Sequence, residues 1–138
     1  MTIEWTPPAR DRVRERTSET ANARIDQDTQ AAMEKASESP EAIRQRLRDL
    51  DREWNVDRAL MLNFAIVAGL SASMTMRNLL HKRRLGGWGA MFWTQIGFLA
   101  YHALRGWCPP VPVFRRLGYR TGPEICAERV ALEKQLDR

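Results

Sequence analysis

Two stretches without a charged residue constrain this chain more than any other feature of its sequence. Residues 59–76 read ALMLNFAIVAGLSASMTM, and residues 86–104 read GGWGAMFWTQIGFLAYHAL. A helix that crosses the apolar layer of a bilayer needs about 17 to 25 such residues, and both stretches reach that length. The apolar side chains of each segment contribute only on the order of a few kcal/mol of free energy to insertion, and polar side chains such as Asn63 and Gln95 offset part of it. We therefore predict two transmembrane helices that insert together as a hairpin.

A soluble helical bundle is the alternative, but the remaining sequence offers too little apolar surface to cover two apolar helices on every side. The chain then divides into a polar, partly helical arm (1–57), the hairpin (58–104), and a basic, proline-containing tail with a final helix (105–138). The predicted fold class is an all-α membrane protein: a two-helix transmembrane hairpin with an N-terminal amphipathic helical arm and a short C-terminal helix.

The charges are distributed unevenly along the chain. Residues 1–57 carry ten basic and thirteen acidic residues, whereas residues 58–138 carry twelve and four. Proteins that bind nucleic acid gather basic residues on one face of a folded domain, often beside stacking aromatic side chains. Here the basic residues flank the two apolar stretches, which is typical of contact with a lipid bilayer and not with nucleic acid.

The basic residues that flank the predicted spans also bear on orientation. Nine lie before the first span or after the second, and four lie in the loop between them, which favours both termini in the cytoplasm of a bacterium and the hairpin in its inner membrane. The loop is itself basic and opposes this orientation, but the N-terminus lacks the basic-then-apolar order of a signal peptide that would export the arm. Trp54, Trp88 and Trp107 stand near the span ends and are expected to act as interface anchors.

Local signals place further helices in the arm and the tail. A thin apolar stripe predicts a weak helix over about 17–37, and Ser39 followed by Pro40 and Glu41 predicts the start of a second. This second helix has an apolar stripe that suits either the membrane surface or packing within the protein; the stripe contains Ile43, Leu47, Leu50 and Trp54. Thr121 and Glu124 predict a capping box that opens a final helix, which is expected to pack on the helix from Ser39.

Small residues recur every four positions in both predicted spans. They are Ala65, Gly69 and Ser73 in the first and Gly86, Ala90 and Thr94 in the second. Small side chains allow helix backbones to approach closely in lipid, so these faces are candidates for packing within the hairpin or against a second copy.

The two cysteines, Cys108 and Cys126, are too few for a disulfide scaffold and lack the spacing of a zinc site. Cys108 is a possible thiol site, because His102 and Arg105 lie near it in the sequence and positive charge favours the reactive thiolate. The C-terminal end of the preceding helix opposes a thiolate there. A structural cysteine is therefore the stronger reading.

Three segments carry a resemblance to a known family: GWCPPVPVFRRLGYRT followed by EICAER, RLRDLDREWNVDRAL before the first span, and RVRERTSETANARIDQ in the arm. They resemble small bacterial inner-membrane proteins of unknown function that are related to the two-helix membrane domain of YgaP-like, rhodanese-associated proteins. The resemblance implies a two-helix hairpin, a tendency to dimerise and an association with sulfur handling. The chain lacks the rhodanese domain, so no catalytic residue carries over.

The predicted function is a non-enzymatic structural or interaction protein of the membrane, which assembles with itself or with a larger complex. A sulfur or redox carrier that uses Cys108, and a small-anion channel built from several hairpins, are the alternatives. Paired carboxylates, a nucleophile with its base, a phosphate loop and a metal cluster are not evident in the sequence, so no catalytic residue, cofactor or metal is predicted.

Overall fold

The computed structural model describes residues 4–82 and 84–137, and within them the chain is entirely helical, without a strand. Arg83, one of the four basic loop residues, lies outside the described residues. The helices are α1 (Arg12–Glu15), α2 (Glu19–Ala36), α3 (Pro40–Arg52), α4 (Val56–Lys82), α5 (Gly86–Arg105), α6 (Val111–Arg116) and α7 (Gly122–Leu136).

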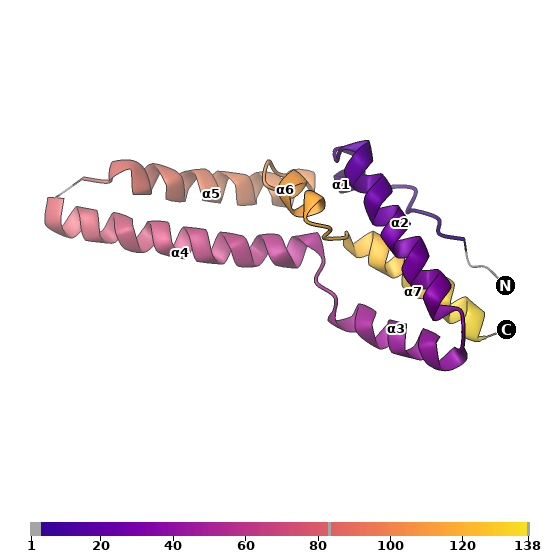
Figure 1. Cartoon of the computed structure of the whole chain (residues 1–138). Helices are drawn as coiled ribbons and strands as arrows, with labels where there is room; N and C mark the ends of the chain where they lie inside the picture. Colours follow the sequence, from indigo (N-terminus) through magenta and orange to yellow (C-terminus); the bar gives the residue numbers. More distant parts are fainter. Residues whose placement is uncertain (1–3, 83, 138) are drawn as a thin grey trace.

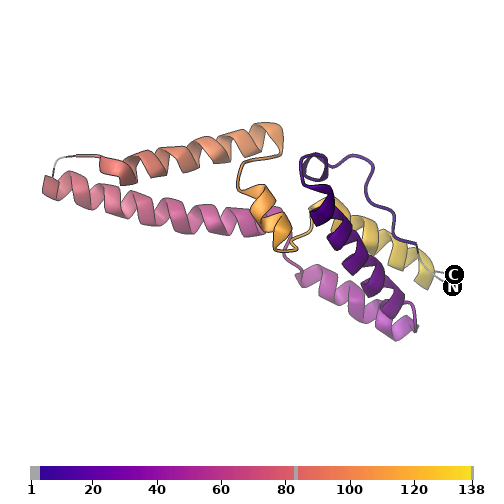
Figure 2. The ribbon, with the colours of Figure 1, turned by 45° about the horizontal axis from the view of Figure 1, so that its top comes forward.

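The two longest apolar helices stand apart from the rest of the molecule. α4 and α5 run side by side in opposite directions and project away from α2, α3 and α7 (Figure 1), and the second view shows the same arrangement (Figure 2), while α6 contacts the base of α4. α4 holds 27 residues, which at about 1.5 Å per residue makes it roughly 40 Å long. Both charge-free stretches predicted from the sequence therefore lie in helices.

The predicted arm and tail fold together into one body, which we call the polar unit (α1, α2, α3, α6 and α7). α3 packs against α7 and α2, and α2 also contacts α6 and α7. An apolar cluster of Ala36, Ile43, Leu50 and Leu132 lies between them. The stripe on the helix from Ser39 thus packs within the protein rather than on a membrane surface. The exception is Trp54, which lies beyond the end of α3 and is half-exposed.

The predicted helix starts are confirmed in detail. The Ser39 side chain accepts a hydrogen bond from Ala42 N at 3.1 Å, and Pro40 occupies the first turn of α3. Thr121 and Glu124 form a capping box in which each side chain accepts from the other's backbone N–H. These motifs are local, so the nearby sequence is sufficient to specify them.

α5 ends at Gly106, whose left-handed backbone (φ 67°) is readily adopted only by glycine. The prolines that follow do not leave the segment irregular: α6 begins after Pro110 and has Pro112 in its first turn, where a missing N–H costs nothing. A second apolar cluster joins this region to the base of α4 and α5; it comprises Val13, Val56, Leu60, Phe64, Cys108 and Val111.

Candidate functional site

The outer surface of α4 and α5 is apolar and exposed over most of its length, and we call it the apolar band. Ile66 is 60% exposed and Leu104 is 80% exposed. The large exposed side chains of the band are Met61, Leu62, Ile66, Leu70 and Met76 on α4, and Met91, Trp93, Ile96, Leu99 and Leu104 on α5. Soluble monomers seldom expose a contiguous apolar surface of this extent.

One helical segment among the described residues is long and apolar enough to cross a membrane. It lies within the stretch Pro40–Lys82, and only 22% of its apolar window is buried. A core helix of a soluble protein would be mostly buried, so burial within this chain does not account for the apolarity of α4. α5, which contains Gln95 and His102, does not reach the same apolarity.

The contact between α4 and α5 uses a different face from the one that the small-residue spacing marks. Ser71 and Gly89 are buried in this contact, and a side chain at Gly89 would come within 3.6 Å of Thr75 Cγ2. Gly86, by contrast, lies near the Asn78 side chain at the far end of the pair. The other predicted residues are exposed, and Ala65 also lines a groove that both helices share; they are Ala65, Gly69, Ser73, Ala90 and Thr94. Within the described residues these side chains are left uncovered.

The hydroxyl groups within the apolar segments are satisfied by their own helices. Thr75 Oγ1 donates to Ser71 O at 2.7 Å, and Ser73 Oγ donates to Gly69 O at 2.8 Å. Thr94 Oγ1 donates to Ala90 O at 2.9 Å. Because an unpaired hydroxyl is costly in hydrocarbon, these bonds make both helices compatible with lipid.

A shallow groove of about 260 Å³ runs across both helices near the middle of the band. Its lining is apolar except for one amide and consists of Met61, Phe64, Ala65, Ala68, Gln95, Ile96 and Leu99. The Gln95 Oε1 atom is buried and has no hydrogen-bond donor among the described residues. A buried amide oxygen without a donor is unfavourable, so a hydrogen-bond donor from another molecule would stabilise this position.

The three tryptophans predicted as anchors lie at the two ends of the apolar segments. Trp54 lies at the base of α4, where Arg58 stacks on its ring at 4.4 Å. Trp107 follows α5 at the same base, with the Arg16 guanidinium 5.8 Å from its ring. Trp88 lies in the first turn of α5, at the opposite end.

Cys108 is fully buried in the apolar cluster at the base of the hairpin. Burial raises the pKa of its thiol above the ordinary 9.0, a hydrogen bond with the Val111 backbone lowers the pKa, and the Asp57 carboxylate raises it again. Neither of the two predicted neighbours activates the thiol: His102 Nε2 lies 3.3 Å from Asp57 Oδ1, and the Arg105 side chain is exposed, whereas Cys108 is buried. These features disfavour a reactive thiolate.

The polar unit encloses a buried ion-pair network that the sequence reading missed. At its centre is Glu124, which is 0% exposed. Arg115 donates to both of its oxygens, at 2.6 and 2.8 Å, and Arg14 donates at 2.5 Å. Arg14 also bonds Asp26 of α2 at 2.7 Å. One carboxylate thus links α7 to α1 and α6, and through Arg14 to α2.

A second carboxylate, Glu128, repeats this arrangement one turn further along α7. It is fully buried, and Arg46 of α3 donates to it at 2.7 and 3.1 Å. Arg120 contacts both Glu128 and Glu53, and its bonds to the Glu53 oxygens are 2.6 Å each. Charged side chains are almost never fully buried unless they are paired, as these are.

The signal that could have revealed this network is the spacing of Glu124, Glu128 and Leu132 on α7. Residues four apart share a helix face, and Leu132 is buried in the apolar cluster. Two glutamates in register with a buried leucine therefore mark a buried acidic face. The apolar residues of this helix suggest a stripe of Ile125, Arg129, Leu132 and Leu136 instead. Ile125 and Leu136 are partly buried against the cluster, but Arg129 is partly exposed and paired with Asp51.

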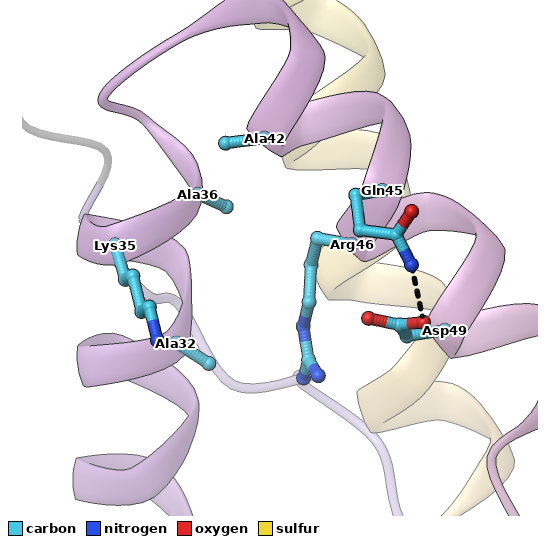
Figure 3. A pocket seen from close by; sticks show the side chains of 7 residues that line it. All are labelled: Ala32, Lys35, Ala36, Ala42, Gln45, Arg46 and Asp49. Atoms are coloured by element: carbon cyan, nitrogen blue, oxygen red, sulfur yellow. Dashed lines mark hydrogen bonds between the residues drawn. The ribbon is translucent and has the colours of Figure 1, made fainter.

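A cleft of about 330 Å³ separates the end of α2 from α3, as Figure 3 shows. Gln45 Nε2 donates to Asp49 Oδ1 across one side, at 3.0 Å. The Arg46 side chain, which lies between the two helices in Figure 3, bonds Glu128. The polar groups of this cleft are largely engaged, so we assign no ligand to it. Among the described residues, no group of three or more His, Cys, Asp or Glu side chains could hold a metal ion.

Comparison of the chain with models of protein families, with curated proteins and with solved structures finds no match. The class that the fold and the apolar band define is an all-helical protein with one helix long and apolar enough to cross a membrane.

Proposed function

We propose that this chain is an integral membrane protein without enzymatic activity, in which α4 and α5 cross the bilayer as a hairpin and hold the polar unit at the surface. Its role is structural: it assembles with itself or with a larger membrane complex. The single observation that carries the proposal is the apolar band, which is exposed on α4 and α5 and which the other described residues leave uncovered.

The dimensions of the band support this proposal. Residues 59–76 span about 27 Å of helix and residues 86–104 about 28 Å, close to the roughly 30 Å thickness of a hydrocarbon layer. Basic side chains follow at both ends of α4, with Arg58 at the base and Arg77 near the loop. The tryptophans lie at the same two levels. Arginine and tryptophan residues gathered at both ends of an apolar segment are typical of membrane-spanning helices and not of soluble proteins.

We propose a bacterial inner membrane with both termini in the cytoplasm, on the strength of nine flanking basic residues against four in the loop. A cysteine in place of Ser18, in a Cys126→Ser background, should then resist an impermeant thiol reagent in intact cells. Labelling as rapid as in broken cells would reverse the orientation.

Self-association is supported by the groove across α4 and α5. Gln95 Oε1 lacks a donor in the described chain, and lipid offers none. The amide N–H of Gln95 from a second copy would supply one, and the exposed small residues Ala65 and Ala90 would let the second copy approach closely. The Gln95→Leu variant should then weaken cross-linking between copies while it leaves insertion intact.

Extraction of membranes with alkaline carbonate tests the main proposal. The protein should stay with the lipid fraction, whereas a protein whose band is covered by a soluble partner would be released. The double variant Ile66→Asp/Leu70→Asp places two charges in the band at about 2.5 to 3.5 kcal/mol each, so it should lose insertion. Val130→Asp, at an exposed apolar residue of the polar unit, is the matched control and should behave as wild type.

The two alternatives receive less support from the structure. The burial of Cys108 disfavours sulfur transfer, and the groove across α4 and α5 has no charged lining residue that would attract an anion. The resemblance to rhodanese-associated proteins still suggests one useful test. Purification in mild detergent, followed by mass spectrometry of the associated proteins, should show whether a sulfurtransferase accompanies the chain.

A further inference from the structure

Three arginines from distant parts of the chain gather at the base of the hairpin. Arg12 and Arg16 lie at the two ends of α1, and Arg105 is the last residue of α5. Together with Glu15 and Leu104 they line a hollow of about 370 Å³, which we call the basic hollow. Its lining thus carries three positive charges and one negative charge.

The arginines of the basic hollow have no carboxylate partner among the described residues. Arg14, which lies between two of them in α1, turns inward and is engaged by Asp26 and Glu124. Arg12 and Arg16 are exposed: Arg16 rests near the Trp107 ring, and the Arg12 side chain lies against Gly106. On the short helix α1, Arg14 therefore has a structural role, whereas Arg12 and Arg16 remain available to a ligand.

The position of the hollow indicates what that ligand is. It borders the end of the apolar band, because Leu104, the most exposed apolar side chain of the band, forms part of its lining. A ligand seated there would meet guanidinium groups on one side and an apolar surface on the other. Guanidinium groups bind phosphate through paired N–H donors, and a free phosphate ion would make no use of the leucine.

We propose that the basic hollow binds the phosphate of an anionic phospholipid headgroup, whose acyl chains run along α5 beside Leu104. This inference rests on the proposed membrane location and deepens it. The bound lipid fixes the depth of the hairpin base, and it bridges Arg16 and Arg105, which are 89 positions apart in the chain.

Native mass spectrometry of the full chain in mild detergent, titrated with phosphatidylglycerol or phosphatidylcholine, tests the inference. Wild type should retain phosphatidylglycerol at least about tenfold more tightly, and each arginine removed should weaken binding by about fivefold at low salt. The test variant is Arg12→Gln/Arg16→Gln/Arg105→Gln. The matched control is Arg24→Gln/Arg44→Gln/Arg48→Gln, which removes the same charge from exposed positions on α2 and α3 and should bind as wild type.

Glu15→Gln provides an independent arm, because removal of the one acidic lining residue should tighten phosphatidylglycerol binding by about fivefold. Equal loss in the test and control variants would mean nonspecific charge attraction and would overturn the inference. So would displacement of the lipid by inorganic phosphate at equal concentration, which would mark a free phosphate site. If the triple variant does not fold, as judged by circular dichroism, Arg105→Gln alone must still show the fivefold loss.

The result is separable from the proposed function. Carbonate-resistant membrane association without a preference for phosphatidylglycerol would remove the lipid site and leave the membrane anchor standing. Release by carbonate would remove the anchor itself.

Discussion

Arg115 and Glu124 face each other inside the polar unit through two parallel hydrogen bonds, and both side chains are fully buried. A buried ion pair of this kind is not a large net source of stability, but removal of one partner leaves a charge without compensation. The pair therefore specifies how α6 and α7 meet, and through Arg14 and Asp26 it extends to α1 and α2.

Substitution of one partner should therefore unfold the polar unit readily. We expect Arg115→Met to lower the free energy of unfolding by about 3 to 5 kcal/mol, and Arg115→Met/Glu124→Leu to recover much of the loss. Denaturant unfolding in mild detergent, followed by far-ultraviolet circular dichroism, measures both. Arg44→Met, which breaks an exposed pair with Glu41, should change stability by less than about 1 kcal/mol. A cost for Arg115→Met no larger than this control would mean that the pair is not essential.

The network should also make the free energy of unfolding depend on pH in the acid range. Burial raises the pKa of Glu124, but hydrogen bonds from Arg115, from the Thr121 backbone and from Arg14 outweigh it, so the pKa lies below its ordinary 4.5. The pKa of Asp26 is likewise held below 3.8, because hydrogen bonds from Arg14 and Trp5 outweigh the effect of burial.

Since both pKa values are lower in the folded state, the unfolded chain binds protons more readily. The contribution of these carboxylates to the free energy of unfolding is complete above their ordinary pKa values. It disappears as the pH falls through their pKa values in the folded state. The denaturation midpoint should thus be nearly constant from about pH 7 to 5 and fall steeply below about pH 4.5. Glu124→Gln should be less stable at neutral pH and show a shallower acid decline; an unchanged decline would exclude Glu124 as a contributor.

The two cysteines should differ sharply in reactivity. Cys126 is exposed, whereas Cys108 is buried with a raised pKa. A thiol reagent near neutral pH should label one cysteine per native chain and two after denaturation. The Cys126→Ser variant should then show almost no native labelling. Rapid labelling of Cys108, or its persulfidation by a sulfur donor, would restore the sulfur-carrier alternative.

The contact between α4 and α5 can be distinguished from the outer face by two matched substitutions. Gly89→Leu places a side chain against Leu85 and Thr75, where an added Cβ would lie at 3.2 and 3.6 Å, so it should separate the two helices at a cost of about 1 to 3 kcal/mol. Gly69→Leu meets no atom within 4 Å and should leave the single chain intact.

Disulfide cross-linking between cysteines introduced into α4 and α5 measures the first effect, and chemical cross-linking between copies measures the second. Gly69→Leu should weaken only the association between copies. If both variants preserve the cross-link between α4 and α5, the assigned contact face is wrong.

The sequence by itself was enough for the features that depend on neighbouring residues. The Ser39 and Thr121 side chains each accept a hydrogen bond from the N–H group three residues ahead, so the capping signals predict the starts of α3 and α7 correctly. Likewise, an absence of charge over 59–76 and 86–104 is a property of consecutive residues, and it predicts α4 and α5 as helices.

The sequence could not show which face of α4 meets α5. Ser71 and Ser73 are the same residue type, yet Ser71 is buried in the contact and Ser73 is exposed. When several faces of a helix carry similar small residues, spacing alone does not choose among them.

Only the tertiary structure decided which charged residues are buried and with which partners they pair. Arg14 meets Glu124 across 110 positions of the chain and Arg46 meets Glu128 across 82, so no local pattern links the partners. Charged side chains are exposed by default, and burial becomes favourable only where folding supplies a partner of opposite charge. The same long-range packing brings Arg12 and Arg105 to one hollow. The free-energy cost of burying a charge, or of placing like charges side by side, depends on neighbours in space, which the order of residues in the sequence does not give.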